Sequence, residues 1–135
     1  MNKLRWRALK LVEMLEDFYW DRELGIKTRF RLDVHEMNYL GEEILNARAY
    51  EPTPYRSLLS AFSICGIEDF EQYQFIDYGC GAGRATLFAA KLGFERGIGI
   101  DFDSGLIDRA NNNLKRFVAK NSLGEGKVEF ICDSV

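Results

Sequence analysis

Hydrophobic positions recur with two different periods along this chain. Over residues 3–20 apolar side chains return every three or four positions, which predicts a helix with one apolar face that packs over the core. Gly25 ends that pattern, because glycine is the common residue just past a helix end. The pattern of residues 26–50 is mixed, and it allows only a short helix over 37–50, interrupted at Gly41.

The pattern of residues 51–66 predicts a second helix in this stretch. The Thr53 side chain can accept a hydrogen bond from a free N–H as N-cap, and Pro54 suits the first helical position. The apolar residues that follow have the spacing of one helix face, and Gly66 can close the helix.

From residue 74 onward short apolar runs alternate with amphipathic stretches. We predict a short buried strand over 74–78 and further strands over 96–101 and 127–132. Helices are predicted between them, over 83–92 and 104–120. Such alternation is typical of a parallel sheet with right-handed crossovers, in which ligands bind beyond the carboxyl ends of the strands.

Composition narrows the class of protein. A chain of 135 residues, 47% of them hydrophobic, can form one globular core, and its apolar runs are too short to span a bilayer. The net charge of −3 gives no general attraction for nucleic acid. The three cysteines (Cys65, Cys80 and Cys132) form no CxxC pair, which argues against a disulfide framework or a zinc site and favours a reducing cytoplasm. The single histidine, His35, argues against a metal cluster or a His-based triad.

A glycine-rich turn follows the first predicted strand of the sheet. That strand ends near Asp77, and Gly79, Gly81 and Gly83 come next, before a helical segment. The following strand ends in Asp101. The order strand, glycine loop, helix, strand, acid predicts a nucleotide-type cofactor whose ribose is held by the acid.

The spacing of the glycines distinguishes between cofactors. The dinucleotide fingerprint GxGxxG/A requires a small residue where this chain has Arg84, which argues against a nicotinamide cofactor. The spacing DxGxGxG instead resembles the first motif of class I S-adenosylmethionine-dependent methyltransferases. The resemblance implies that the methionine end of S-adenosylmethionine lies over the backbone of residues 79–83, with Asp77 orienting its amino group.

Two further motifs carry the same resemblance. Asp101 stands where that family places an acid on both ribose hydroxyls, and Phe102 stands where an apolar side chain packs on adenine. Asp133 follows the third strand and matches the acid that accepts from the adenine amino group.

A second resemblance lies upstream of the glycine motif. The stretch YEPTPY over residues 50–55 is similar to a group of largely uncharacterised bacterial methyltransferases, whose glycine motif this chain matches except at Tyr78, Cys80 and Ala82. The layout is also similar to the non-SET histone-lysine methyltransferases, which implies that Glu51 and Thr53 help to close the site. Alternatively, Thr53 serves only to begin the helix that follows it.

Together these features predict a fold and a domain layout. We expect an α/β, Rossmann-like three-layer methyltransferase sandwich, partial, with about three parallel strands. Residues 1–70 are predicted to form a helical extension that covers the cofactor, and residues 71–135 the first half of the cofactor-binding domain. Since the fourth motif of that family is absent, we expect a truncated chain whose open edge at 74–78 permits a homodimer.

The predicted function is methyl transfer from S-adenosylmethionine to an unidentified acceptor, a small molecule or a protein, with no catalytic base or metal assigned. Three alternatives stay open: a non-catalytic S-adenosylmethionine-binding module, a nicotinamide-dependent oxidoreductase, and aminopropyl transfer as in spermidine synthases. Cys80 is either an activated thiol at a helix N-terminus or a small residue of the turn.

Overall fold

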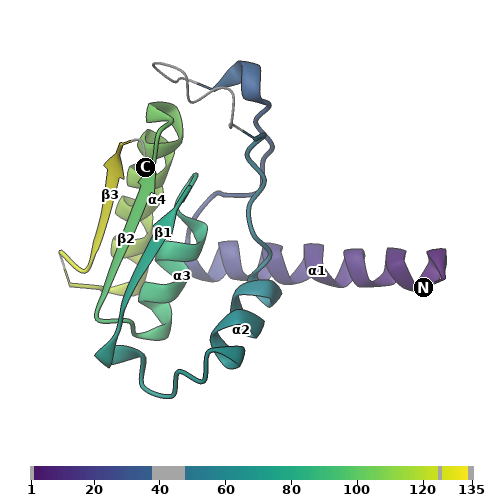
Figure 1. The fold of residues 1–135 in the computed structure, drawn as a ribbon, viewed down its shortest axis with the longest axis horizontal. Helices are drawn as coiled ribbons and strands as arrows, with labels where there is room; N and C mark the ends of the chain where they lie inside the picture. Colours follow the sequence, from purple (N-terminus) through teal and green to yellow (C-terminus); the bar gives the residue numbers. More distant parts are fainter. Residues whose placement is uncertain (1, 38–47, 125, 134–135) are drawn as a thin grey trace.

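The computed structural model describes residues 2–37, 48–124 and 126–133. Three parallel strands and four α-helices make up most of it (Figure 1). In chain order the elements are α1 (Lys3–Leu24), the 3₁₀ turn η1 (Val34–Glu36), α2 (Tyr55–Ile64), the 3₁₀ turn η3 (Phe70–Gln72), β1 (Gln74–Tyr78), α3 (Arg84–Leu92), β2 (Arg96–Asp101), α4 (Ser104–Asn121) and β3 (Val128–Cys132). The predicted helix over 37–50 lies largely outside the described residues.

The sheet has the strand order β1-β2-β3, and both pairs are parallel, as predicted. In its register Tyr78 pairs with Ile100, and Asp101 pairs with Cys132, so the carboxyl ends of all three strands meet at one edge. Helices α3 and α4 pack on the strands and contact each other. This arrangement places the loops after β1 and β2 side by side.

The sequence predicted a buried strand over 74–78, but strand β1 is partly exposed. It forms an edge of the described sheet, and its side chains alternate between exposed and half-buried. Ile76 is 49% exposed and Tyr78 is 62% exposed. The pattern of five apolar and polar residues gave the correct bounds but could not show that this strand has one neighbouring strand, β2, among the described residues.

Helix α1 ends at Gly25, whose φ of 76° is the left-handed conformation that glycine adopts easily. Its apolar face does not pack over the core along its whole length, contrary to the prediction. The helix projects from the sheet (Figure 1), and Leu4, Leu11 and Leu15 remain mostly exposed. Only its last turns reach the core, where Leu24 is buried and Trp20 packs edge-to-face on Phe88.

Helix α2 begins at Tyr55, so Thr53 is not the N-cap that the sequence predicted. Pro54 takes that position and has no side-chain acceptor to offer. The Oδ1 atom of Asp17 in α1 accepts instead from the Tyr55 N–H at 3.1 Å. A carboxylate at this place also interacts favourably with the helix dipole, and sequence spacing could not show it because the two residues are 38 positions apart.

Some predictions concern chemistry rather than fold. Cys65, Cys80 and Cys132 are free thiols, the first and last exposed and Cys80 buried. His35 lies on the surface in η1. Among the described residues, no helix combines the length and the apolar character needed to cross a membrane.

Candidate cofactor site

The turn between β1 and α3 is built on three glycines with positive φ, namely 79° at Gly79, 53° at Gly81 and 85° at Gly83. L-residues rarely adopt this conformation, which explains the glycine at each position. The N–H groups of Gly79 and Cys80 both donate to the Ile100 carbonyl, at 2.8 and 3.0 Å. The turn is therefore fixed to the end of β2.

The three glycines face different surroundings. A Cβ at Gly81 would lie 2.3 Å from the Tyr50 ring, and one at Gly83 would lie 2.5 Å from the Phe130 ring. A Cβ at Gly79 would meet no atom of the described residues within 4 Å. Gly81 and Gly83 thus permit close packing, whereas Gly79 leaves its backbone open on one side.

Asp101 ends β2 and is almost fully buried. Its Oδ2 accepts from the Gly81 N–H at 2.8 Å, and its Oδ1 accepts from the Asp103 N–H at 3.0 Å. One carboxylate therefore holds both the glycine turn and the start of the loop after β2. Each oxygen still has lone-pair capacity for a further donor.

Asp77 lies one strand away, near the end of β1, and is half-buried. Burial, and then the nearby Asp101 carboxylate, raise the pKa of the Asp77 carboxyl from 3.8 to about 6. A positively charged group between the two acids would relieve this repulsion.

A cavity of about 350 Å³ opens at this edge of the sheet. Seven of the nine residues predicted for the site line it: Glu51, Thr53, Asp77, Gly79, Gly81, Asp101 and Phe102. They come from the glycine turn, from the two strand ends and from the segment before α2. The structure thus brings together residues that are 50 positions apart.

Gly83 and Asp133 do not line the cavity. Gly83 is buried where α3 begins, in the close packing described above. Asp133 is exposed after β3, and its N–H donates to the Asp101 carbonyl at 3.0 Å. The structure places Asp133 next to the site through its backbone.

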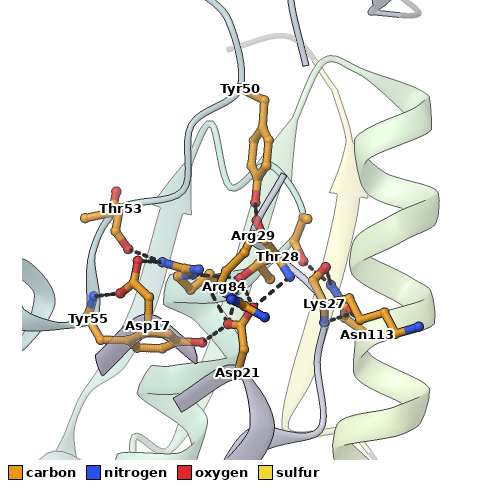
Figure 2. Close-up of polar contacts among 11 residues, drawn as sticks. Asp17, Asp21, Lys27, Thr28, Arg29, Tyr50, Thr53, Tyr55, Arg84 and Asn113 are labelled. Carbon is orange, nitrogen blue, oxygen red and sulfur yellow. Dashed lines mark hydrogen bonds and ion pairs between the residues drawn. The ribbon is translucent and has the colours of Figure 1, made fainter. Parts of the chain in front are cut away.

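Tyr50, Cys80 and Arg84 also line the cavity, although sequence reasoning did not place them among the cofactor-binding residues. The Tyr50 ring covers Gly81, and its hydroxyl donates to the Thr28 carbonyl at 3.0 Å. Burial and nearby carboxylates raise the pKa of the Cys80 thiol well above its usual range, which favours a small turn residue over an activated thiol. Arg84 is buried among carboxylates (Figure 2). An arginine directly after the glycine turn, at the start of a largely apolar helix, was the available signal.

The model of the family described as Ribosomal protein L11 methyltransferase (PrmA) matches residues 60–129, just over half of the chain. The chain belongs to this family. The match covers the glycine turn, both strand-end acids and the start of β3, up to Glu129.

Known proteins of the PrmA family are similar to this chain at low identity. The ribosomal protein L11 methyltransferase of Pectobacterium atrosepticum is 29% identical over 125 residues, covering 78% of this chain and 40% of the relative. The chain spans about two fifths of the length of such full-length curated relatives.

Two solved structures are similar to this chain. Protein-L-isoaspartate O-methyltransferase superposes with a TM-score of 0.54 at 14% identity, over 84% of this chain and 34% of its own. An RNA methyltransferase from Salinibacter ruber, solved with S-adenosyl-L-homocysteine, has a TM-score of 0.47 at 28% identity, over 59% of this chain and 48% of its own.

Membership of the PrmA family confirms the predicted class, the S-adenosylmethionine-dependent methyltransferases of class I. The likeness to the isoaspartate methyltransferase confirms the α/β fold with parallel strands flanked by helices. S-adenosylmethionine is accordingly the cofactor of this family.

Proposed function

We propose that this chain forms the cofactor-binding part of an S-adenosylmethionine-dependent methyltransferase. The cavity at the carboxyl edge of the sheet is the observation that carries the proposal, because it unites the glycine turn with both acids. The open side of Gly79 supports close approach of a ligand to the backbone, which a Cβ would obstruct.

Each lining residue has a role that fits its chemistry. Asp101 would accept from the two ribose hydroxyls, since its oxygens already accept one N–H each and can accept more. Asp77 would pair with the cofactor's ammonium group. That positive charge would favour the ionised Asp77 carboxylate, whereas burial favours the neutral carboxyl. Phe102 would pack on the adenine ring, and Glu51 with Thr53 would close the cavity.

Asp133 is proposed to act at the adenine edge, although it stands outside the cavity lining. Its backbone N–H is held by the Asp101 carbonyl, so its position follows that of Asp101. Bound S-adenosylmethionine would supply an activated methyl group on its sulfonium, and the residues of this chain would bind and orient the cofactor. No described residue is proposed as a base.

The acceptor is proposed from the relatives. These relatives are named ribosomal protein L11 methyltransferases, so ribosomal protein L11 is the first protein to test as acceptor, with a small molecule as the alternative. A ribosomal acceptor and the free thiols both support a cytoplasmic location. A homodimer through the β1 edge stays a prediction.

Isothermal titration calorimetry tests the cofactor proposal. The wild-type chain should bind S-adenosylmethionine and S-adenosyl-L-homocysteine, and NAD⁺ should give no heat. Asp101→Asn should weaken binding by about tenfold or more, because it removes charge-assisted hydrogen bonds. The control Glu95→Gln removes an exposed carboxylate just before β2, at the opposite edge of the sheet, and should bind as wild type does.

Absence of heat with both methyl-donor ligands would overturn the proposal, as would preferential binding of NAD⁺. Transfer of a labelled methyl group to purified L11 by the wild-type chain would support an enzyme. Binding without transfer to L11 or to small-molecule extracts would favour a non-catalytic module.

A further inference from the structure

Arg84, the first residue of α3, is 2% exposed, and its guanidinium is held by three different segments. Nε donates to Thr28 Oγ1 at 2.7 Å. Nη1 donates to Asp17 Oδ2 at 2.7 Å and to the Thr53 carbonyl at 3.2 Å. Figure 2 shows these contacts converging on Arg84 from α1 and from the segments around Thr28 and Thr53.

The two carboxylates next to Arg84, those of Asp17 and Asp21, also bond to Tyr55. Asp17 joins the guanidinium to the first N–H of α2, since its other oxygen accepts from Tyr55. Asp21 lies 3.5 Å from Nη2 and accepts from the Tyr55 hydroxyl at 2.7 Å and from Thr28. The guanidinium carbon also lies 4.6 Å from the centre of the Tyr55 ring. Arg84 is therefore the centre of one buried polar cluster.

Residues 50–53, here called the cover segment, form one wall of the cofactor cavity. At its start Tyr50 packs on Gly81 and donates to the Thr28 carbonyl. At its end the Thr53 carbonyl accepts from Arg84. Both ends are thus tied to the Arg84 cluster, directly at Thr53 and through Thr28 at Tyr50.

The chemistry of the cluster favours arginine over other residues. A guanidinium presents several donors in a fixed plane, so one side chain can bond to a carboxylate, a hydroxyl and a carbonyl at once. Lysine would keep the charge but not this planar arrangement. Substitution of Arg84 by lysine therefore tests the planar arrangement of donors. It keeps a positive charge beside Asp17 and Asp21, so these largely buried carboxylates are not left unpaired.

We propose that Arg84 is a positioning residue for the cofactor: it holds the cover segment so that Glu51 and Thr53 close on the ligand. The inference rests on the proposed function, because it requires a cofactor in the cavity. Arg84 acts through the cover segment, because Nε and Nη1 donate to protein groups. Among the described residues Nη2 has no hydrogen-bond partner and lies 3.5 Å from the Asp21 carboxylate.

The test measures the dissociation rate of S-adenosyl-L-homocysteine from the wild-type chain, from Arg84→Lys and from the control Arg56→Lys. Arg56 also joins α1 to α2, through Glu16 at 2.6 and 2.9 Å, but it is exposed and does not line the cavity. Arg84→Lys should release the ligand about tenfold faster, and Arg56→Lys should release it at the wild-type rate.

A double-mutant cycle with Glu51→Ala separates positioning from a general loss of stability. In the wild-type background Glu51→Ala should weaken binding several-fold, and in the Arg84→Lys background its effect should fall below twofold. An unchanged dissociation rate in folded Arg84→Lys would overturn the proposal, as would additive effects of the two substitutions. If Arg84→Lys does not fold, Asp17→Asn replaces it, because it weakens the ion pair and keeps an acceptor oxygen.

Hydrogen exchange of the ligand-free chain distinguishes failure of this inference from failure of the proposed function. The amide of Tyr55 is bonded to Asp17, so Arg84→Lys should speed its exchange while Arg56→Lys should not. Absence of S-adenosyl-L-homocysteine binding by the wild-type chain would refute the proposed function. Unchanged Tyr55 exchange in Arg84→Lys would refute the anchoring itself.

Discussion

Asp77 provides a quantitative test because its carboxyl is both half-buried and close to Asp101. Its pKa lies at about 6 in the folded chain and at 3.8 without burial. A difference of about two pKa units corresponds to about 3 kcal/mol. Because the folded pKa is raised, ionised Asp77 destabilises the fold, and this penalty grows as pH rises from about 4 to above 6.

Asparagine imitates the neutral carboxyl, so Asp77→Asn should stabilise the ligand-free chain. At pH 7.5 the free energy of unfolding, measured by urea denaturation, should rise by about 2–3 kcal/mol, and at pH 5 by about half of that. Glu95→Gln, which removes an exposed carboxylate, should change it by less than about 0.5 kcal/mol at either pH. The reasoning is wrong if Asp77→Asn is destabilising at pH 7.5, or if its effect is the same at both pH values.

The same carboxyl should make cofactor affinity pH-dependent. If Asp77 pairs with the ammonium group of the cofactor, binding requires the ionised form, and the affinity for S-adenosyl-L-homocysteine should fall several-fold between pH 7.5 and pH 5. In Asp77→Asn the affinity should be lower and should lose this part of its pH dependence. An identical pH profile for the two proteins, followed by calorimetry, would remove Asp77 from the binding site.

Three further predictions concern the turn, the thiols and the buried cluster. Gly81→Ala should lower the free energy of unfolding by about 2–4 kcal/mol in urea denaturation, because it adds a contact of 2.3 Å with Tyr50 to the strain of a positive φ. Gly79→Ala should lower it by about 1 kcal/mol, from strain alone. Equal losses for the two variants would contradict the packing of Tyr50 on Gly81. A thiol reagent should modify the exposed Cys65 and Cys132 in the folded chain and Cys80 only on unfolding, and modification of all three thiols without unfolding would contradict the buried turn. Tyr55→Phe should cost about 1–2 kcal/mol, since Asp21 loses a buried hydrogen bond of 2.7 Å, and a neutral result would contradict that contact.

The sequence was most informative where local pattern decides structure. The strand over 74–78 and the strand over 96–101 have the predicted bounds, because the glycine turn ends the first apolar run and Asp101 ends the second. The glycine turn was predictable for the same reason, since positive φ at three alternating positions requires glycine. Asp101 followed from its place at the end of the second strand.

Predictions failed where a distant residue decides the outcome. Thr53 has the right side chain for an N-cap, but Asp17 from α1 bonds to the Tyr55 N–H. The burial of Arg84 depends on two carboxylates more than 60 positions away in the sequence, so no local pattern could reveal it. The exposed face of α1 likewise reflects which elements lie beside it, and helical periodicity alone does not contain that information.

The central claim is that the cofactor lies over the glycine turn, within reach of Asp101. Glycine-selective ¹⁵N labelling and a titration with S-adenosyl-L-homocysteine test it most directly, because the twelve glycines of the chain include both cavity and distant positions. The amide signals of Gly79 and Gly81 should shift strongly, and those of Gly66 and Gly124 should not. Unchanged signals from Gly79 and Gly81 at saturating ligand, or shifts confined to the distant glycines, would contradict the account.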